Sequence, residues 1–327
     1  MKKFLAALFV VVLCLSAGAF AAESDSEEIT VGVLRFQSST VDVGTDQASI
    51  VGDVFTQRLA MSEAMSVLGQ GELTSAASEA KISMTGYVSN KNAAKIGKIA
   101  GCKYIIAGTV TNLKMKASSS GVAFIGAFGS HKAEADAAAE VRVIDVETGE
   151  VVESFAETTH ASQSGSYAGI AGFGGGQTDL NGMQQAAISN LATKLSMKTR
   201  DVLGDPAAVS AASSKEVTLN VGTMGGASEG VMFRIYTGSG KSEKNLAVVK
   251  IKSAQTEEST AVLADKNSGN LSLVRKGDKI ALVDSNELKS IQKGKKFAKS
   301  RPKESSSAAD LEELMSSTKT KKSKHTK

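Results

Sequence analysis

Three histidines and two cysteines are the side chains that could give this chain metal or thiol chemistry. His131 and His160 fall in different segments of the sequence, and His325 lies close to its end. The sequence contains no His-x-x-x-His and no Cys-x-x-Cys spacing, by which neighbouring side chains share a zinc ion. We therefore expect no metal ligands.

Two other patterns could suggest catalysis or a cofactor. Gly172–Gly176 is glycine-rich and precedes a predicted helix, but it lacks the Gly-Lys-Ser/Thr ending of a phosphate-binding loop, so a flexible loop is favoured. Asp145 precedes Thr148 and Gly149, where an aspartate accepts hydrogen bonds within a turn. The spacings support no Ser-His-Asp arrangement. We expect no catalytic residue, no cofactor and no enzyme; a hydrolase using Asp145 or His160 is the enzymatic alternative.

The first residues predict export. Lys2 and Lys3 precede the apolar run 4–15, and Ala19-Phe20-Ala21 is a small-x-small cleavage site, so residues 1–21 are expected to form a signal peptide. The apolar run is too short to span a membrane. The mature protein is therefore expected in the periplasm or at the outer membrane.

The two cysteines differ in their expected roles. Cys14 follows Leu13 rather than a small residue, so we expect it to belong to the apolar part of the signal and to carry no lipid. Cys102 is then the one cysteine of the mature chain, which excludes an internal disulfide. We expect Cys102 to be a small packed residue; a reactive thiol is the alternative.

Alternating strand and helix patterns predict an α/β domain over residues 28–203, with a mixed sheet flanked by helices. The helix at 47–63 is expected to be capped by Thr45 or Asp46. The apolar face of this helix is expected to consist of Ile50, Val51, Val54, Phe55 and Leu59. Further elements are predicted as strands at 29–36 and 65–68, and as helices at 72–81 and from Ser89 to a stop at Gly101.

The second half of this domain has the clearest strand signals. Residues 104–115 predict a strand. Residues 133–143 have apolar side chains at every odd position, which is typical of a strand with one solvent-exposed face. Residues 151–160 should pair back antiparallel across a turn, and a long helix is expected at 180–203. The Gly/Ser-rich segments 117–130 and 161–177 are thin in apolar residues, and we interpret them as mobile loops or as hairpins.

A different pattern follows the long helix. Residues 204–215 are expected to be a linker, and short strands over 216–285 predict a small all-β barrel. Residues 286–327 carry twelve Lys or Arg against five Asp or Glu and predict a disordered basic tail. This tail could contact anionic membrane or cell-wall polymers weakly, or could simply be solvated. The mildly acidic remainder argues against nucleic acid as a partner.

Several segments fall in an order that resembles the CsgG-like family, the curli production assembly/transport component. They are 29–36, 52–59, the run Ala93-Ala94-Lys95-Ile96-Gly97-Lys98 leading to Tyr104-Ile105-Ile106-Ala107-Gly108-Thr109-Val110, and Val141–Val151 with its Asp145-x-x-Thr148-Gly149-Glu150 hairpin. The resemblance covers about residues 28–203. Residues 216–284 show a shorter and weaker resemblance to the C-terminal domain of flagellar assembly protein T.

The CsgG-like resemblance implies an α/β domain that is not an enzyme. In the best-known members, outer-membrane lipoproteins assemble into rings, and two hairpins from each subunit close a secretion pore. The corresponding segments here are 113–142 and 153–183, and both have few of the apolar residues that a membrane strand needs. The lipid-bearing cysteine of that pattern is also missing in our interpretation.

The sequence therefore predicts a non-catalytic cell-envelope component that acts in assembly, export or scaffolding. Its expected partners are envelope proteins and further copies of itself, through sheet edges and the segments 117–130 and 161–177. The alternative is a soluble periplasmic adaptor for a cell-wall or flagellar-type assembly, without a pore.

Overall fold

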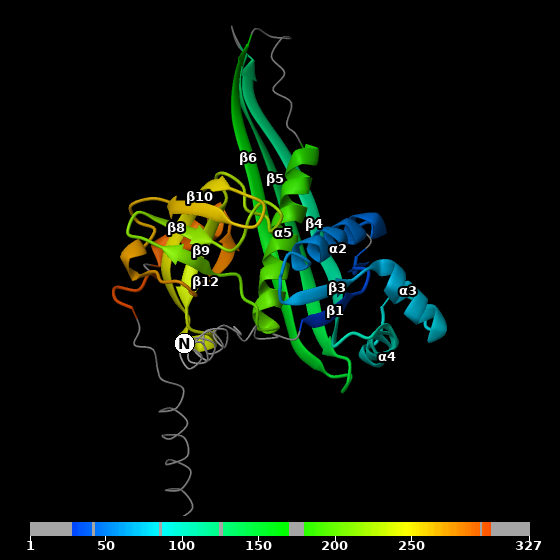
Figure 1. Ribbon diagram of the computed structural model, residues 1–327. Helices are drawn as coiled ribbons and strands as arrows, with labels where there is room; N and C mark the ends of the chain where they lie inside the picture. Colours follow the sequence, from blue (N-terminus) through cyan, green and yellow to red (C-terminus); the bar gives the residue numbers. More distant parts are fainter. Residues whose placement is uncertain are drawn as a thin grey trace, which may run out of the picture.

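The computed structural model contains two β-sheets, and the long helix α5 (Leu180–Val202) packs against both (Figure 1). The expected signal peptide with Cys14, the segment Gly172–Gly176 and the end of the basic tail lie outside the described residues. The structure describes residues 28–40, 43–84, 87–123, 127–169, 180–294 and 296–301.

The first sheet is mixed, as the sequence predicts for an α/β fold. Its strands follow the order β3-β1-β4-β5-β6, and β2 pairs with β4 beside this path. The first three run parallel, and β4, β5 and β6 run antiparallel. The bounds are β1 (Ile29–Val33), β2 (Gln37–Ser38), β3 (Met65–Leu68), β4 (Tyr104–Ala123), β5 (Ala127–Asp145) and β6 (Val151–Gly169).

Helices cover both faces of this sheet. The helix α2 (Thr45–Leu59) and α5 bury their apolar side chains in one core with the strands. The helices α3 (Gln70–Glu79) and α4 (Asn90–Ala100) close a smaller core on the other side. Within the described residues, no helix has both the length and the apolar character needed to cross a membrane.

The predicted helix boundaries are confirmed to within a few residues, and one inward-facing prediction is wrong. Ser89 caps α4 by accepting a hydrogen bond from the backbone of Asn92, and Gly101 ends it with φ +76°. The cap of α2 is Gly44 rather than Thr45 or Asp46. Ile50, expected on the apolar face of α2, is 48% exposed, because the face that packs inward is formed by Ala48, Val51, Phe55 and Leu59.

The prediction of an alternating strand at 133–143 is confirmed. Every odd position from Ala133 to Val143 is buried, with at most 1% of its surface exposed. The four alanines at the start of this stripe are small, so α5 can lie close to β5. The face of α5 that covers them has Ala187, Leu191 and Leu195 fully buried.

The interpretation of 117–130 and 161–177 as loops is wrong wherever the structure describes them. Strand β4 continues to Ala123, β5 begins at Ala127, and β6 continues to Gly169. The 113–142 segment is a hairpin, whereas 153–183 supplies the strand β6 and then the start of α5 at Leu180. Glycine and serine have low strand propensity, and here the backbone pairing with β5 outweighs it.

The second sheet is antiparallel and curled, with the strand order β12-β9-β10-β11-β8-β7. Its inner face forms a separate core, in which Phe233, Ile235 and Val249 have no exposed surface. Residues 216–285 supply β8 to β12, which confirms the expectation of a small all-β unit. The bounds are β7 (Val209–Ala212), β8 (Glu216–Leu219), β9 (Met232–Thr237), β10 (Lys244–Ala254), β11 (Ser259–Leu263) and β12 (Lys279–Val283).

The segment 204–215, expected to be a linker, contains β7 instead. Val209 is 1% exposed and donates its backbone N–H to the carbonyl of Asp278. The residues of this segment are small, but Ala207 and Val209 are apolar and pack in the second core. The division of the chain into domains at the predicted boundaries stays a prediction.

The basic tail does not begin at residue 286. Residues Ser285–Lys293 form α6, capped by Asp284, whose carboxylate accepts the backbone N–H groups of Asn286 and Glu287. Arg301 then makes a two-pronged ion pair with Asp278. The prediction of disorder is wrong for 286–294 and 296–301, and it lies outside the described residues beyond them.

Candidate functional site

The most prominent candidate for an interaction surface is the three-stranded ribbon of β4, β5 and β6. These strands have 20, 19 and 19 residues, and a rise of about 3.3 Å per residue makes each about 60 Å long. Figure 1 shows the ribbon running well past α5 and the other helices. The sequence placed partner contacts at 117–130 and 161–177, and the described parts of both lie in this extension.

The two chemical candidates in the ribbon do not come together. Asp145 accepts hydrogen bonds from the backbone N–H (2.8 Å) and hydroxyl (3.0 Å) of Thr148, as the sequence predicts for a turn aspartate. These bonds, the backbone bond first, lower the pKa of Asp145. His160 contacts Asp136 through Nδ1 at 2.7 Å, halfway along β6. Asp145 and His160 therefore share no site.

The remaining histidines add no cluster. The side-chain surroundings of His131 are not described, and His325 lies outside the described residues. Among the residues with described positions, no group of three or more His, Cys, Asp or Glu side chains could hold a metal ion.

Cys102 is 7% exposed and packs between β1 and α3 as the sequence predicts. A Cβ on Gly32 would lie 2.8 Å from its sulfur, so the glycine leaves the space that the thiol occupies. Burial, with a smaller contribution from the charge of Glu72, raises the pKa of the Cys102 thiol to about 11.

We expect Cys102 to resist alkylation in the folded protein, because both access and thiolate formation are suppressed. At pH 8 the native mature protein should react with iodoacetamide at least 100-fold more slowly than the protein in 6 M guanidinium. The raised pKa alone lowers the fraction of reactive thiolate by about two orders of magnitude. Mass spectrometry of the alkylated protein measures both rates. Equal rates would contradict the packed position.

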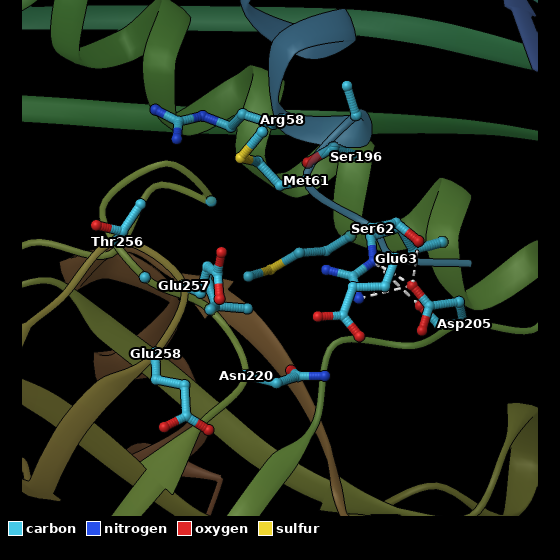
Figure 2. A pocket seen from close by; sticks show the side chains of 16 residues that line it. Arg58, Met61, Ser62, Glu63, Ser196, Asp205, Asn220, Thr256, Glu257 and Glu258 are labelled. Atoms are coloured by element: carbon cyan, nitrogen blue, oxygen red, sulfur yellow. Dashed lines mark hydrogen bonds and ion pairs between the residues drawn. The ribbon is translucent and has the colours of Figure 1, made fainter. Parts of the chain in front are cut away.

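A polar cleft that the sequence did not predict lies between the two sheets. It has a volume of about 550 Å³ and opens between the end of α2, the C-terminal half of α5 and the second sheet. Figure 2 shows Arg58, Met61 and Ser62 on one side and Thr256, Glu257 and Glu258 on the other.

Arg58 connects the two sides of this cleft, and Arg200 holds the turn that follows α5. Arg58 donates to the carbonyl oxygen of Met224 at 2.9 Å and to the hydroxyl of Ser189 at 2.8 Å. Burial lowers the pKa of the Arg58 guanidinium, which nevertheless stays charged. Arg200 pairs with the Asp205 carboxylate at 2.7 Å, and Ser62 donates to the same oxygen at 2.6 Å.

The cleft offers charge and hydrogen bonding without catalytic geometry. Its rim carries exposed glutamates (Glu63, Glu257 and Glu258), and its arginines are engaged in the contacts above. None of its lining residues is a histidine or cysteine that could serve as a base or thiol nucleophile. Arg58 lies within the quoted segment 52–59, and only its contact with residue 224, far along the chain, reveals its role.

A second, smaller cavity of about 140 Å³ lies between β6, α5 and β9. Its lining includes Glu157, Lys194, Lys198 and Arg234. Burial raises the pKa of Glu157, although the charges of Lys194, Lys198 and Arg234 oppose the rise. The folded state therefore favours the protonated carboxyl more than the unfolded chain does.

We expect Glu157→Gln to stabilise the protein above about pH 5, because the raised pKa means that the ionised Glu157 carboxylate destabilises the fold. The wild type loses stability as the pH rises from the unfolded pKa of about 4.3 through the higher folded value, because ionisation is opposed only in the fold. The glutamine has no such loss. Urea midpoints at pH 4 and pH 7.5 measure the difference; a variant less stable than wild type at pH 7.5 would contradict it.

Comparison with known proteins gives one family match. Residues 16–202 match the family described as curli production assembly/transport component CsgG. This match ends at residue 202, so it does not test the resemblance of residues 216–284 to flagellar assembly protein T. No curated protein sequence matches the chain.

Several solved structures show low similarity. The lipoprotein GNA1162 from Neisseria meningitidis is 12% identical with a TM-score of 0.31, covering 51% of this chain and 97% of its own. The LpoB C-terminal domain from Salmonella enterica is 15% identical with a TM-score of 0.29, covering 46% and 91%. The PelC dodecamer from Paraburkholderia phytofirmans is 15% identical with a TM-score of 0.25, covering 51% and 86%. These scores are too low to support an argument about function.

The family match covers more than half of the 327 residues, and its segments are those that build the mixed sheet and its helices. The chain therefore belongs to the CsgG family, the curli production assembly/transport components of the cell envelope.

Proposed function

We propose that the protein is a non-catalytic component of the cell envelope that acts in assembly, export or scaffolding by binding other macromolecules. The observation that carries this proposal is the β4–β6 ribbon, whose strands of 19 or 20 residues exceed the length that the helices cover. A long ribbon whose last strand pairs with no further described strand offers backbone groups and exposed surface to a partner.

Self-association is the proposed way in which the ribbon acts, with envelope proteins as the further partners. Light scattering coupled to size exclusion, on the mature protein with and without detergent, tests it. We expect a species larger than the monomer in at least one condition. A strict monomer in both would remove self-association from the proposal.

The second candidate is a soluble periplasmic adaptor that presents the second sheet to the cell wall or to a flagellar-type assembly. It is favoured by the separate core of that sheet, which includes Phe233 and Leu219 and does not depend on the ribbon. Cell fractionation separates the two candidates: the adaptor should enter the salt-washed soluble pool, and the assembly component should stay with the membranes.

We also propose that the basic tail contacts anionic surfaces weakly. The chain must be cut after Arg301 to test this, because residues before it are packed against the second sheet. The truncated protein should bind vesicles containing anionic phosphatidylglycerol less well at low salt than the full mature chain, and the difference should vanish at high salt. Equal binding at low salt would contradict the contact.

A further inference from the structure

The outer edge of β6 is open to pairing by its position in the sheet. Strand β6 is the last in the order β3-β1-β4-β5-β6, and it pairs only with β5 among the described strands. In an antiparallel pair, every second residue turns its N–H and C=O groups away from the neighbour. Such a row of backbone groups can accept another strand.

Two charged side chains occupy this edge at its middle. The ammonium of Lys194 donates to the carbonyl oxygen of Thr158 at 2.9 Å, and the carboxylate of Asp284 accepts the backbone N–H of His160 at 3.3 Å. Thr158 and His160 are two alternate residues of β6 whose backbone N–H and C=O groups point away from β5. One side chain supplies the donor and the other the acceptor that a neighbouring strand would supply.

These side chains are held firmly in place. The side chain of Lys194 is 4% exposed and that of Asp284 is 11% exposed, and their charged atoms lie 3.8 Å apart. Glu287 completes the cluster at 2.8 Å from the Lys194 nitrogen. Asp284 uses one oxygen for the edge and the other to cap α6, so the start of α6 is tied to the edge of β6.

We propose that Lys194 and Asp284 form an edge cap that keeps β6 closed to a second copy of this chain. The inference rests on the proposed self-association and adds a way in which it is regulated. The segment that begins α6 has to leave the edge before β6 can pair with the β6 of another molecule. The cap places a buried charge pair where strand addition would begin, which is a means of preventing uncontrolled sheet extension.

The sequence of β6 suits pairing with itself. An antiparallel register centred on Thr158 places Glu157 opposite Thr159 and Glu153 opposite Gln163, so no two like charges face each other. A register centred on Glu157 would instead set two carboxylates opposite, which is destabilising. The Thr158-centred register therefore predicts that the two Thr158 residues meet on the twofold axis.

Cysteine cross-linking of the full mature chain tests the cap. In Thr158→Cys the two cysteines of a paired dimer would have Cα atoms about 5.5 Å apart, which a disulfide spans. We expect little cross-linked dimer with the cap intact, and at least threefold more when Asp284→Asn is added. Asparagine keeps the oxygen that caps α6 and turns an N–H₂ group toward the N–H of His160. Cys102 is buried and does not compete.

Matched controls separate the cap from general effects. Asp145→Asn changes an aspartate that accepts two hydrogen bonds, both from Thr148 in the turn before β6 and none from α6, and it should leave cross-linking unchanged. Ser154→Cys alone should not cross-link, because Ser162 lies opposite it in this register. Where Asp284→Asn fails to fold by circular dichroism, Asp284→Ser removes the edge acceptor and keeps a helix cap.

Equal cross-linking with and without Asp284→Asn, or none in either folded protein, overturns the edge cap. The light-scattering result then distinguishes a failure of the edge cap from a failure of the proposed self-association. Wild-type multimers without cross-linking at Thr158 leave the proposed function standing on another surface, and a monomer in every condition removes both.

Discussion

Gly108→Ala is expected to cost about 2–3 kcal/mol of folding free energy, because the new methyl group has no space. A Cβ at this position would lie 2.3 Å from the ring of Phe36, whose side chain is 1% exposed. The ring cannot move away easily, since it also packs against Phe55 with ring centroids 5.2 Å apart. Urea unfolding followed by circular dichroism measures the loss.

A double variant shows whether the ring is the cause. Phe36→Leu opens space at the cost of a partly filled cavity, so Gly108→Ala should cost at least 1 kcal/mol less in its presence. Gly71→Ala is the matched control, because a Cβ there meets nothing within 4 Å; it should leave stability unchanged or slightly raised. Additive costs for Gly108→Ala and Phe36→Leu would contradict this account.

Arg301→Ala is expected to destabilise the protein by about 3 kcal/mol, although Arg301 lies in a segment that reads as a solvated basic tail. Its two terminal nitrogens hold the two carboxylate oxygens of Asp278 at 2.8 and 2.9 Å, and the Asp278 side chain is 2% exposed. Removing the guanidinium leaves a buried carboxylate that still accepts the backbone N–H of Arg275. Thermal and urea unfolding both measure the effect.

Lys299→Ala removes the same charge two residues away from an exposed position and should change stability by less than about 0.5 kcal/mol. Asp278→Asn should recover part of the loss when it is added to Arg301→Ala, because no unpaired charge is then buried. Equal effects of Arg301→Ala and Lys299→Ala would show that the ion pair contributes nothing.

The sequence by itself determined the elements and most of their buried faces. The alternation over 133–143 and the helical spacing over 180–203 each specify which side chains turn inward, because the periods of strand and helix are fixed by local geometry. Ser89 and Gly101 likewise fixed the ends of α4 through local hydrogen bonding and a positive φ. Order and spacing of these segments also carried the resemblance to the CsgG-like family, which the match over 16–202 confirms.

Only the tertiary structure decided the length of the ribbon, the place of β7 and the anchoring of the tail. The Gly/Ser-rich ends of β4 and β6 are held by backbone pairing with β5. Backbone pairing depends little on the side chains, so no local sequence pattern predicts it. The contacts of Lys194 with Glu287 and of Arg301 with Asp278 join residues 93 and 23 positions apart. Such pairs depend on which distant segments the fold brings together. A charged residue considered alone is expected to be solvated, because its partner cannot be recognised in the local sequence.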